Sequence, residues 1–475
     1  MEYRRLAEIQ RDLSTRSITL PDLVEFYLSQ IPSQPQLNVF LEVFEEEARQ
    51  AAVEIQARWD QGQAGRLAGL VLGIKDVLCY QGHRLGASSR MLEGFESQIT
   101  ATAVQRLLDE DAIIIGRQNC DEFAMGSSNE NSAYGPTLNP RHESYVPGGS
   151  SGASAAAVAA NLCMASLGSD TGGSVRQPAA YCGVVGLKPS YGRVSRWGLI
   201  AYASSFDQIG PITRSVEDAE LLLEIMAGPD GRDQTAAQIP HSKSPFDQAG
   251  SFRFGVLSEV MESPGLDPGV RQVLNQQIEK LVNQGHQVVN LSFPLLEYLV
   301  PCYYILTTAE ASSNLSRYDG VHYGYRASEV ADLEELYLKT RSQGFGKEVQ
   351  RRILLGNFVL SAEHYEAYYT QAMKVRRLIA ERTQELLTQC DFLLTPTAPS
   401  TAFKIGEKTS DPIEMFLSDV FTVHANLAGI PAISVPGGIH ENGLPIGLQL
   451  MGKAYTEATL LQGAKVLEGL MEAKA

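Results

Sequence analysis

The sequence predicts an α/β protein in which helices are layered on a β-sheet. The chain has 475 residues, of which 44% are hydrophobic, and this is enough for a large core. Short apolar runs with the length and composition of buried strands recur along it, as at 67–74 and 112–115. Segments with helical spacing of apolar residues alternate with these runs, and such alternation indicates a layered α/β fold.

Charge and cysteine content exclude several classes of protein. The net charge of −16 repels phosphate backbones, so we expect no nucleic-acid binding by this chain alone. The six cysteines are scattered without a C-x-x-C pair, which favours a reducing cytoplasm over a disulfide framework or a zinc site. No apolar run reaches the roughly 18 residues of a membrane span. The charged N-terminal helix also lacks the apolar centre of a signal peptide.

Helices are predicted throughout the first 60 residues. Pro21 suits the first turn of a helix, and the apolar residues up to Ile31 then fall on one face. A second helix is expected over 42–59. We expect a single domain over 1–475, with a helical N-terminal layer at about 1–60, a catalytic core at about 65–225, an exposed excursion at about 228–251, and a C-terminal sheet with specificity segments at about 252–475.

The stretch 166–195 carries the strongest signal for chemistry. It is rich in glycine and is expected to be a loop rather than a core element or a sheet strand. Within it, the run DTGGS places the hydroxyl of Ser174 directly after two glycines. Glycines let backbone N–H groups approach a ligand closely, so this serine could face a carbonyl whose oxygen those groups stabilise. The alternative is a surface turn with a solvated serine.

A second glycine–serine turn, GGSSG at 148–152, precedes the first. It opens an alanine-rich helix at 153–160, and a short strand is predicted at 164–167. One helix and one strand between Ser150 and Ser174 can return the chain to the same place, so the two turns can converge. The sequence between His142 and His241 contains no histidine, so a local Ser–His pair is excluded.

Lys75 is the candidate base, because it ends the buried-strand run 67–74. Burial disfavours the charged form of a lysine and lowers its pKa, so that the neutral amine can accept a proton. The alternative is a lysine whose side chain extends to water from the strand end.

Together these residues resemble the amidase signature family, whose fold is a large mixed, twisted β-sheet sandwiched between helix layers. The resemblance implies a Ser–cis-Ser–Lys mechanism, with Ser174 as the nucleophile, Ser150 as the bridging serine after a cis Gly149–Ser150 peptide bond, and Lys75 as the base. It also implies an oxyanion hole formed by the N–H groups of Thr171, Gly172, Gly173 and Ser174. Ala153 stands where the family usually continues with glycine, and alanine suits the helix that begins there.

Three later segments are similar to the glutaminase subunits of tRNA-dependent amidotransferases within this family: YDGVHYGYR (318–326), GFGKEVQRRI (344–353) and NLAGIPAISVP (426–436). The resemblance implies that Arg352 binds the α-carboxylate of glutamine and that Asp419 binds its α-ammonium. Tyr303 or Tyr304 is expected to line the pocket, and the loop 119–129, including Met125, to border it.

Other interpretations of these residues stay open from the sequence. Arg352 could instead pair with Glu348, four residues earlier on a helix surface. Asp419 could be a solvated helix position, and Asp121 and Glu122 could be ordinary solvated loop residues.

By the same resemblance, this chain hydrolyses L-glutamine and passes ammonia through an internal passage to a partner subunit. That partner amidates ATP-activated Glu-tRNA(Gln), Asp-tRNA(Asn) or both, and a third small subunit completes a heterotrimer. We expect no cofactor in this chain, which lacks a G-x-x-x-x-G-K-[ST] loop, and we expect ATP and magnesium on the partner.

Three alternatives to this function remain. The chain could be a stand-alone amidase of the same superfamily or a non-catalytic scaffold of a tRNA-modifying complex. It could also be an α/β-hydrolase, because GGSSG fits the nucleophile-elbow pattern G-x-S-x-G. That pattern requires a strand leading into the turn, and Pro140 and Pro147 in the approach disfavour one.

Overall fold

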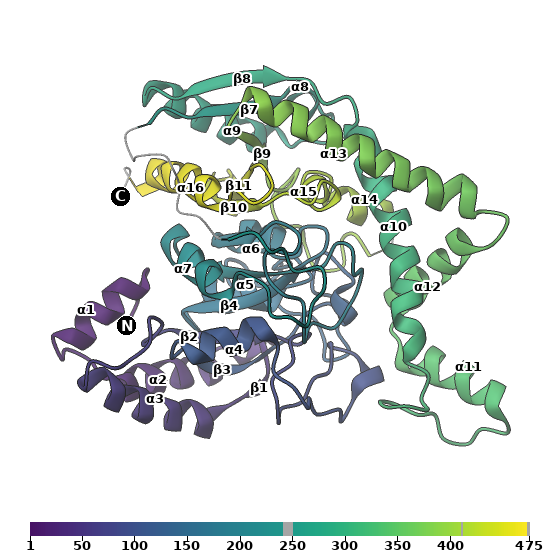
Figure 1. Cartoon of the computed structure of the whole chain (residues 1–475), viewed down its shortest axis with the longest axis horizontal. Coiled ribbons are helices and arrows are strands. Elements are labelled where there is room, and N and C mark those ends of the chain that lie inside the picture. Colours follow the sequence, from purple (N-terminus) through teal and green to yellow (C-terminus); the bar gives the residue numbers. More distant parts are fainter. Residues whose placement is uncertain (241–249, 410–411, 473–475) are drawn as a thin grey trace.

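The computed structural model describes residues 1–240, 250–409 and 412–472, and a single 11-stranded sheet runs through it (Figure 1). The strand order is β1-β3-β2-β4-β6-β5-β10-β11-β9-β7-β8. The strands are β1 (Phe40–Val43), β2 (Val71–Lys75), β3 (Ile113–Gln118), β4 (Ala165–Asp170), β5 (Val185–Lys188), β6 (Gln208–Thr213), β7 (Arg253–Leu257), β8 (Gln287–Leu291), β9 (Phe392–Pro396), β10 (Ala432–Ile439) and β11 (Pro445–Met451).

The sheet is mixed. Strand β2 is parallel to β3 and β4, and β7 is parallel to β8 and β9, whereas the other pairs are antiparallel. Every residue of β2, β3 and β4 is buried, so these strands are covered on both faces. The predicted large mixed sheet between helix layers is confirmed.

Helices cover both faces of the sheet, and Figure 1 shows α1–α3 at the end of the molecule that holds β1 and β3. The helices are α1 (Leu6–Ser14), α2 (Leu20–Gln30), α3 (Glu45–Asp60), α4 (Thr102–Asp109), α5 (Gly152–Ala159), α6 (Arg176–Cys182), α7 (Val216–Met226), α8 (Ser258–Met261), α9 (Pro268–Asn283), α10 (Leu299–Asn314), α11 (Leu333–Gly344), α12 (Lys347–Leu360), α13 (Gln371–Gln389), α14 (Pro412–Leu417), α15 (Val423–Leu427) and α16 (Glu457–Glu472). Over the described residues, no helix is both long and apolar enough to cross a membrane.

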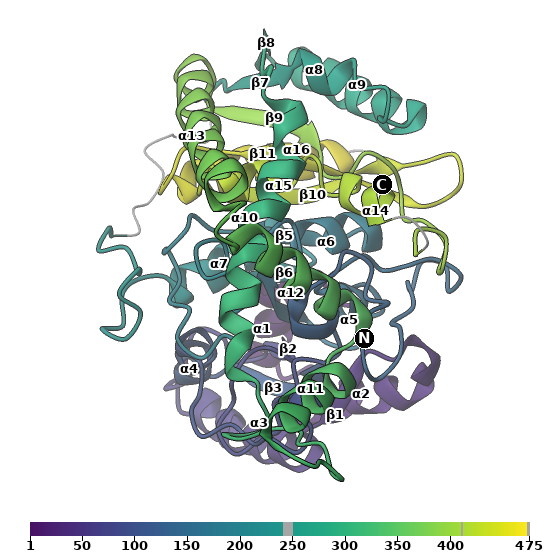
Figure 2. The ribbon, with the colours of Figure 1, turned by 90° about the vertical axis from the view of Figure 1, so that its right-hand side faces the viewer.

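Strand alternation separates two apolar clusters at the C-terminal half of the sheet. Leu394 and Ile433 point into a cluster shared with α16, whereas their neighbours Leu393 and Ala432 point into a cluster shared with α10, α13 and α15. Successive residues of a strand face opposite sides, so helices cover both faces here. Figure 2 shows α10 crossing in front of the sheet with α12 beside it, and the two helices are in contact.

Two predictions of local structure were wrong. The helix expected from residue 42 begins only at Glu45, because Phe40–Val43 forms the edge strand β1 against β3. The stretch 166–195 contains β4, α6 and β5 rather than a loop alone. One of its glycines serves packing: a Cβ at Gly186 would lie 2.7 Å from the Ala179 Cβ of α6.

Other predictions concern the candidate tyrosines, the excursion and the domain. Helix α10 begins at Leu299 and therefore carries both Tyr303 and Tyr304. Of the excursion predicted over 228–251, residues 241–249 lie outside the described residues. The predicted domain over 1–475 and its internal divisions stay predictions, although the sheet takes strands from both halves of the chain.

Candidate active site

The site begins where two parallel neighbouring strands end. Lys75 is the last residue of β2 and Asp170 is the last residue of β4. Parallel strands bring their carboxyl ends to the same edge, which is where α/β sheets place their sites. The loop Thr171–Val175 then leads from β4 into α6, so the sheet holds Lys75 close to this loop.

The Lys75 ammonium group lies among three serine hydroxyls. Its Nζ is 2.7 Å from Ser150 Oγ, 3.0 Å from Ser151 Oγ and 2.9 Å from Ser169 Oγ. Lys75 is 0% exposed, so its side chain does not extend to water. Burial lowers the pKa of Lys75 to about 8, although nearby groups such as Asp121 raise it. A substantial fraction of the amine is therefore neutral near pH 8.

The three hydroxyls can serve either protonation state of the amine. The Ser151 hydroxyl donates to the Ser169 carbonyl at 3.2 Å and so accepts from Lys75. A charged amine donates three hydrogen bonds, whereas a neutral amine donates two and accepts one. Ser150 or Ser169 can supply that one donation, so Ser150 is placed to pass a proton to a neutral Lys75.

The two glycine–serine turns converge, as predicted. The Gly149–Ser150 peptide bond is cis, in agreement with the family resemblance. The Ser151 N–H donates to the Ser174 carbonyl at 3.1 Å, which joins the two turns directly. Ser174 is 8% exposed while Ser150 is 0% exposed, and within the described chain the Ser174 hydroxyl has no hydrogen-bond partner. The Ser174 hydroxyl is thus free beside the buried cluster of Lys75 and its serine partners.

The loop Thr171–Val175, called the nucleophile loop, carries the predicted nucleophile Ser174. Its backbone donors differ from one another. The Gly173 N–H donates to Asp170 Oδ1 at 2.9 Å, so it is already engaged. The N–H groups of Thr171, Gly172 and Ser174 have no acceptor in the described part of the chain, and they are the donors left for an oxyanion. Gly172 must be glycine here, because a Cβ would lie 2.4 Å from the Tyr303 hydroxyl oxygen.

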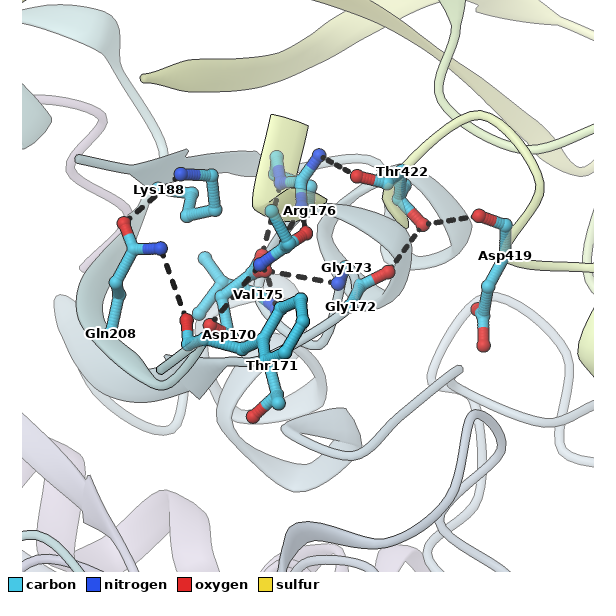
Figure 3. Close-up of polar contacts among 12 residues, drawn as sticks. Asp170, Thr171, Gly172, Gly173, Val175, Arg176, Lys188, Gln208, Asp419 and Thr422 are labelled. Carbon is cyan, nitrogen blue, oxygen red and sulfur yellow. Dashed lines mark hydrogen bonds and ion pairs between the residues drawn. The ribbon is translucent and has the colours of Figure 1, made fainter. Parts of the chain in front are cut away.

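A buried ion pair holds this loop from behind (Figure 3). The Arg176 guanidinium donates to both carboxylate oxygens of Asp170, at 3.0 and 2.9 Å, and to the Thr422 carbonyl at 2.9 Å. Burial raises the pKa of Asp170, but Arg176 outweighs it and holds that pKa at about 2. The Thr422 hydroxyl donates to the Gly172 carbonyl at 2.7 Å. These bonds fix the direction of the loop.

A second buried lysine, Lys188 at the end of β5, lies behind the same loop (Figure 3). Its Nζ donates to Gln208 Oε1 at 3.0 Å and to the carbonyls of Pro189 and Ile430 at 2.8 and 2.6 Å. Burial lowers the pKa of Lys188 to about 7. Gln208 belongs to β6, whereas Pro189 directly follows β5 and Ile430 lies just before β10. Lys188 therefore links three segments of the sheet, and we assign it a structural role.

Arg352 of α12 is buried, at 3% exposed, rather than on a helix surface. The sequence alternative of a pair with Glu348 is also realised, since Arg352 Nε donates to Glu348 Oε1 at 2.9 Å. Its Nη1 donates to the Tyr202 hydroxyl at 2.7 Å, and the guanidinium lies 5.5 Å from the Tyr304 ring centre. The Arg352 guanidinium is therefore a buried planar cation whose position is fixed by Glu348 and Tyr202.

Asp419 is buried as well, which excludes the solvated alternative. The Ser127 hydroxyl donates to Asp419 Oδ2 at 2.5 Å, and the Tyr304 hydroxyl donates to the same oxygen at 3.3 Å. Burial raises the pKa of Asp419 to about 7, against the opposing effects of Ser127 and Arg352. Tyr304 thus stands between the carboxyl of Asp419 and the guanidinium of Arg352.

Both candidate tyrosines face the site, in different places. The Tyr303 ring packs on Gly172 of the nucleophile loop, and Tyr304 contacts Asp419 and Arg352. The two rings are T-shaped with centroids 5.0 Å apart. A cavity of about 190 Å³ beside them is lined by Arg352, Glu348 and Phe416, with further residues from α12 and the loop after Met125.

Met125 itself is fully buried in the apolar cluster with Phe123, so its side chain anchors the loop 119–129 to the core. Asp121 and Glu122 are buried too, which contradicts their interpretation as solvated residues. The Asp121 carboxylate accepts the N–H groups of Asn129 and Asn131 at 2.9 and 3.1 Å, and so closes the loop on itself.

Several residues of the site were missed at the sequence level: Ser127, Ser151, Ser169 and Tyr202. Ser151 and Ser169 carried a usable signal, because Ser151 lies in the GGSSG turn and Ser169 directly precedes DTGGS. Ser127 lies in the loop 119–129 that was expected to border the pocket, but nothing near it in the sequence indicates its bond to Asp419. Tyr202 carried no signal, since its partner Arg352 is far away in the sequence. Among the described residues, no group of three or more His, Cys, Asp or Glu side chains is placed to hold a metal ion.

A mixed sheet covered by helices, a buried lysine bonded to a cis-peptide serine, and a free serine hydroxyl after two glycines define a serine-dependent amidase type of protein. The chain belongs to the Amidase family, whose profile matches residues 22–461, and within it to the amidase signature proteins.

Relatives of the whole chain support this. It is 47% identical to a glutamyl-tRNA(Gln) amidotransferase subunit of Chlorobium phaeobacteroides, over 99% of this chain and 100% of that protein. It is 48% identical to the corresponding subunit of Koribacter versatilis, over 97% of each. The crystal structure of the corresponding subunit of Thermotoga maritima is similar with a TM-score of 0.77 and 40% identity, over 94% of this chain and 93% of that one.

Proposed function

We propose that this chain is the glutaminase subunit of a tRNA-dependent amidotransferase. The observation that carries the proposal is the Lys75–Ser150 hydrogen bond of 2.7 Å in a solvent-free cluster beside the free hydroxyl of Ser174. That arrangement suits attack on an amide. The names of the relatives, which share about half of its residues over nearly the full length, support the assignment to an amidotransferase.

The reaction follows from the arrangement. Ser174 Oγ attacks the carboxamide carbon, its proton passes to Ser150 Oγ, and the proton of Ser150 passes to neutral Lys75. The resulting oxyanion accepts hydrogen bonds from the free N–H groups of the loop 171–174. When the C–N bond breaks, the proton returns along the same path to the nitrogen, and ammonia leaves. Water then hydrolyses the ester on Ser174 by the same path and releases glutamate.

Selection of free glutamine requires a cation and an anion, because its α-carbon carries a carboxylate and an ammonium. Arg352 can bind the carboxylate through two parallel N–H groups, and Asp419 can bind the ammonium. Both side chains are buried and both adjoin Tyr304, so they can act on one small zwitterion. This pair favours glutamine over an amide without charges.

The remaining parts of the reaction are assigned to partners. We expect ammonia to pass to a second subunit that binds ATP, magnesium and the mischarged tRNA, with a third small subunit between them. The net charge of −16 on this chain disfavours direct tRNA contact. We expect the complex in the cytoplasm, where aminoacylated tRNA is used.

The test is ammonia release from glutamine by the full chain, alone and with its partner subunits. Ser174→Ala removes the nucleophile and is expected to abolish release while glutamine still binds. Ser150→Ala leaves Lys75 bonded to Ser151 and Ser169 and is expected to slow release by about 10²–10⁴-fold. Near-normal turnover by Ser174→Ala would overturn the mechanism. Full activity of the isolated chain on simple amides would instead favour a stand-alone amidase.

A further inference from the structure

One buried amide touches three segments of the site. Gln177 lies on α6, three residues after Ser174, and is 0% exposed. Its own N–H donates to the Gly173 carbonyl at 2.8 Å, which fixes it to the nucleophile loop. Its side chain reaches away from that loop to two other chain segments, each with a part in the site.

The two ends of this side chain have different partners. Gln177 Oε1 accepts the N–H of Gly149 at 2.9 Å, immediately before the Gly149–Ser150 bond. Gln177 Nε2 donates to the Ser127 carbonyl at 2.8 Å. A reversed amide would place oxygen against oxygen and nitrogen against nitrogen, so only this orientation satisfies both partners.

Each partner leads to a group that acts in the reaction. Gly149 precedes the bridging Ser150, whose hydroxyl bonds Lys75. Ser127 holds Asp419 through its hydroxyl, at 2.5 Å. Gly149 and Ser127 are themselves buried, so water does not reach them. If Gln177 were lost, the Gly149 N–H and the Ser127 carbonyl would each be left without this hydrogen-bond partner.

We propose that Gln177 is a positioning residue that sets the proton-relay turn and the ammonium-binding carboxylate at fixed places relative to the nucleophile. Gln177 Oε1, which accepts from Gly149, fixes the position of Ser150 and therefore affects the rate of the chemical step. Gln177 Nε2, which donates to the Ser127 carbonyl, fixes the position of Ser127 and, through the Ser127 hydroxyl, that of Asp419. This contact therefore affects the preference for substrates with an α-ammonium. This inference rests on the glutaminase activity proposed above.

Two variants separate the two ends. Gln177→Glu keeps an oxygen for the Gly149 N–H, and its carboxylate form turns a second oxygen toward the Ser127 carbonyl, so that form loses the donor end alone. The variant is measured at pH 7 and pH 9, because a protonated carboxyl would still donate to the Ser127 carbonyl. Gln177→Met has a similar length and loses both ends. Ser154→Ala is the matched control, because Ser154 is a fully buried residue of the neighbouring α5 whose hydroxyl has no partner in the described part of the chain.

The experiment measures ammonia release by the full chain assembled with its partner subunits. Its substrates are glutamine and glutaramate, which keeps the carboxylate and the carboxamide but lacks the ammonium. For Gln177→Glu we expect KM for glutamine to rise about tenfold, kcat to stay within about threefold, and KM for glutaramate to stay within about twofold. For Gln177→Met we expect kcat on both substrates to fall about tenfold or more as well. Ser154→Ala should match the wild type.

A double variant excludes a purely structural effect. If Gln177→Glu acts through Ser127, then adding it to Ser127→Ala should raise KM for glutamine little beyond Ser127→Ala alone. Equal losses on glutamine and glutaramate in Gln177→Glu, additive effects in the double variant, or wild-type constants in Gln177→Glu at both pH 7 and pH 9 would each overturn the proposal. These outcomes remain decisive even if Gln177→Met does not fold. A wild-type complex that releases no ammonia from glutamine would instead overturn the proposed function, and the role of Gln177 with it.

Discussion

Lys75 Nζ and Ser150 Oγ lie 2.7 Å apart with no solvent exposure on either residue. The lysine comes from the end of a central strand and the serine from a turn 75 residues later. Their hydrogen bond joins the sheet to the glycine–serine turns in one hydrogen-bonded unit. The protonation of this lysine decides whether the unit can accept a proton.

The pH dependence of turnover should follow Lys75. Because burial lowers its pKa to about 8, roughly one tenth of the amine is neutral at pH 7 and most is neutral at pH 9. We therefore expect kcat/KM to rise about tenfold from pH 7 to pH 9. Glutaramate is the suitable substrate, since it does not depend on Asp419. A flat profile over this range, or the same rise in residual Lys75→Met activity, would argue against Lys75 as the base.

A second titration should affect binding rather than turnover. Burial raises the pKa of Asp419 to about 7, so its carboxyl is largely neutral at pH 6 and largely charged at pH 8. An ammonium binds the charged form, so we expect KM for glutamine to fall as the pH rises from 6 to 8. Asp419→Asn should show a high KM without this dependence. If Asp419→Asn kept the dependence, another group would have to be responsible.

The close packing of Tyr303 on Gly172 can be tested by adding one methyl group at residue 172. In Gly172→Ala the new Cβ would lie 2.4 Å from the Tyr303 hydroxyl oxygen, so the loop or the ring must move. We expect the free energy of unfolding in urea to fall by about 1–3 kcal/mol and kcat to fall with it. Gly469→Ala, on α16 with open space at its Cβ, is the control and should not destabilise. In a Tyr303→Ala background the Gly172→Ala change should cost less than it does in the wild type, because the ring that the new Cβ would meet is absent.

The ion pair behind the nucleophile loop should matter for stability. Arg176→Met leaves the Asp170 carboxylate buried without its main partner. We expect the free energy of unfolding to fall by about 3–5 kcal/mol. Arg377→Met removes an exposed pair with Glu381 on α13 and should cost far less than Arg176→Met, because water screens the exposed pair. Urea unfolding at pH 7 measures both, and equal costs would contradict the importance of burial here.

Acid should weaken the same pair. The pKa of Asp170 is held at about 2, below its value near 4 in an unfolded chain. Its contribution to stability is therefore complete above about pH 4 and is lost as the pH falls toward 2.

Much of this site could be predicted from the sequence because its signals are local. The two glycine–serine turns, the strand that ends at Lys75 and the helix between Ser150 and Ser174 are each defined by consecutive residues. Their meeting follows from one helix and one strand returning the chain to the same edge of the sheet.

What the sequence could not predict depends on long-range contacts. Strand β1 has only four residues, and it exists because β3 offers it an edge. The bond between Ser127 and Asp419 joins residues 292 positions apart, and the bond between Tyr202 and Arg352 joins residues 150 positions apart. The engagement of the Gly173 N–H by Asp170 depends on a carboxylate rotamer, which no pattern of residue types reveals.

The groups that we propose for breaking the amide bond and most of those that we propose for choosing the amide come from separate stretches of the chain. Lys75, Ser150 and Ser174 all precede residue 175, whereas Tyr304, Arg352 and Asp419 lie on helices and loops added beyond it. Exchanging those later side chains could redirect the enzyme to a different amide while its hydrolytic chemistry stayed intact. A scaffold divided in this way can acquire new substrates by changes in one stretch while the other stretch keeps its sequence.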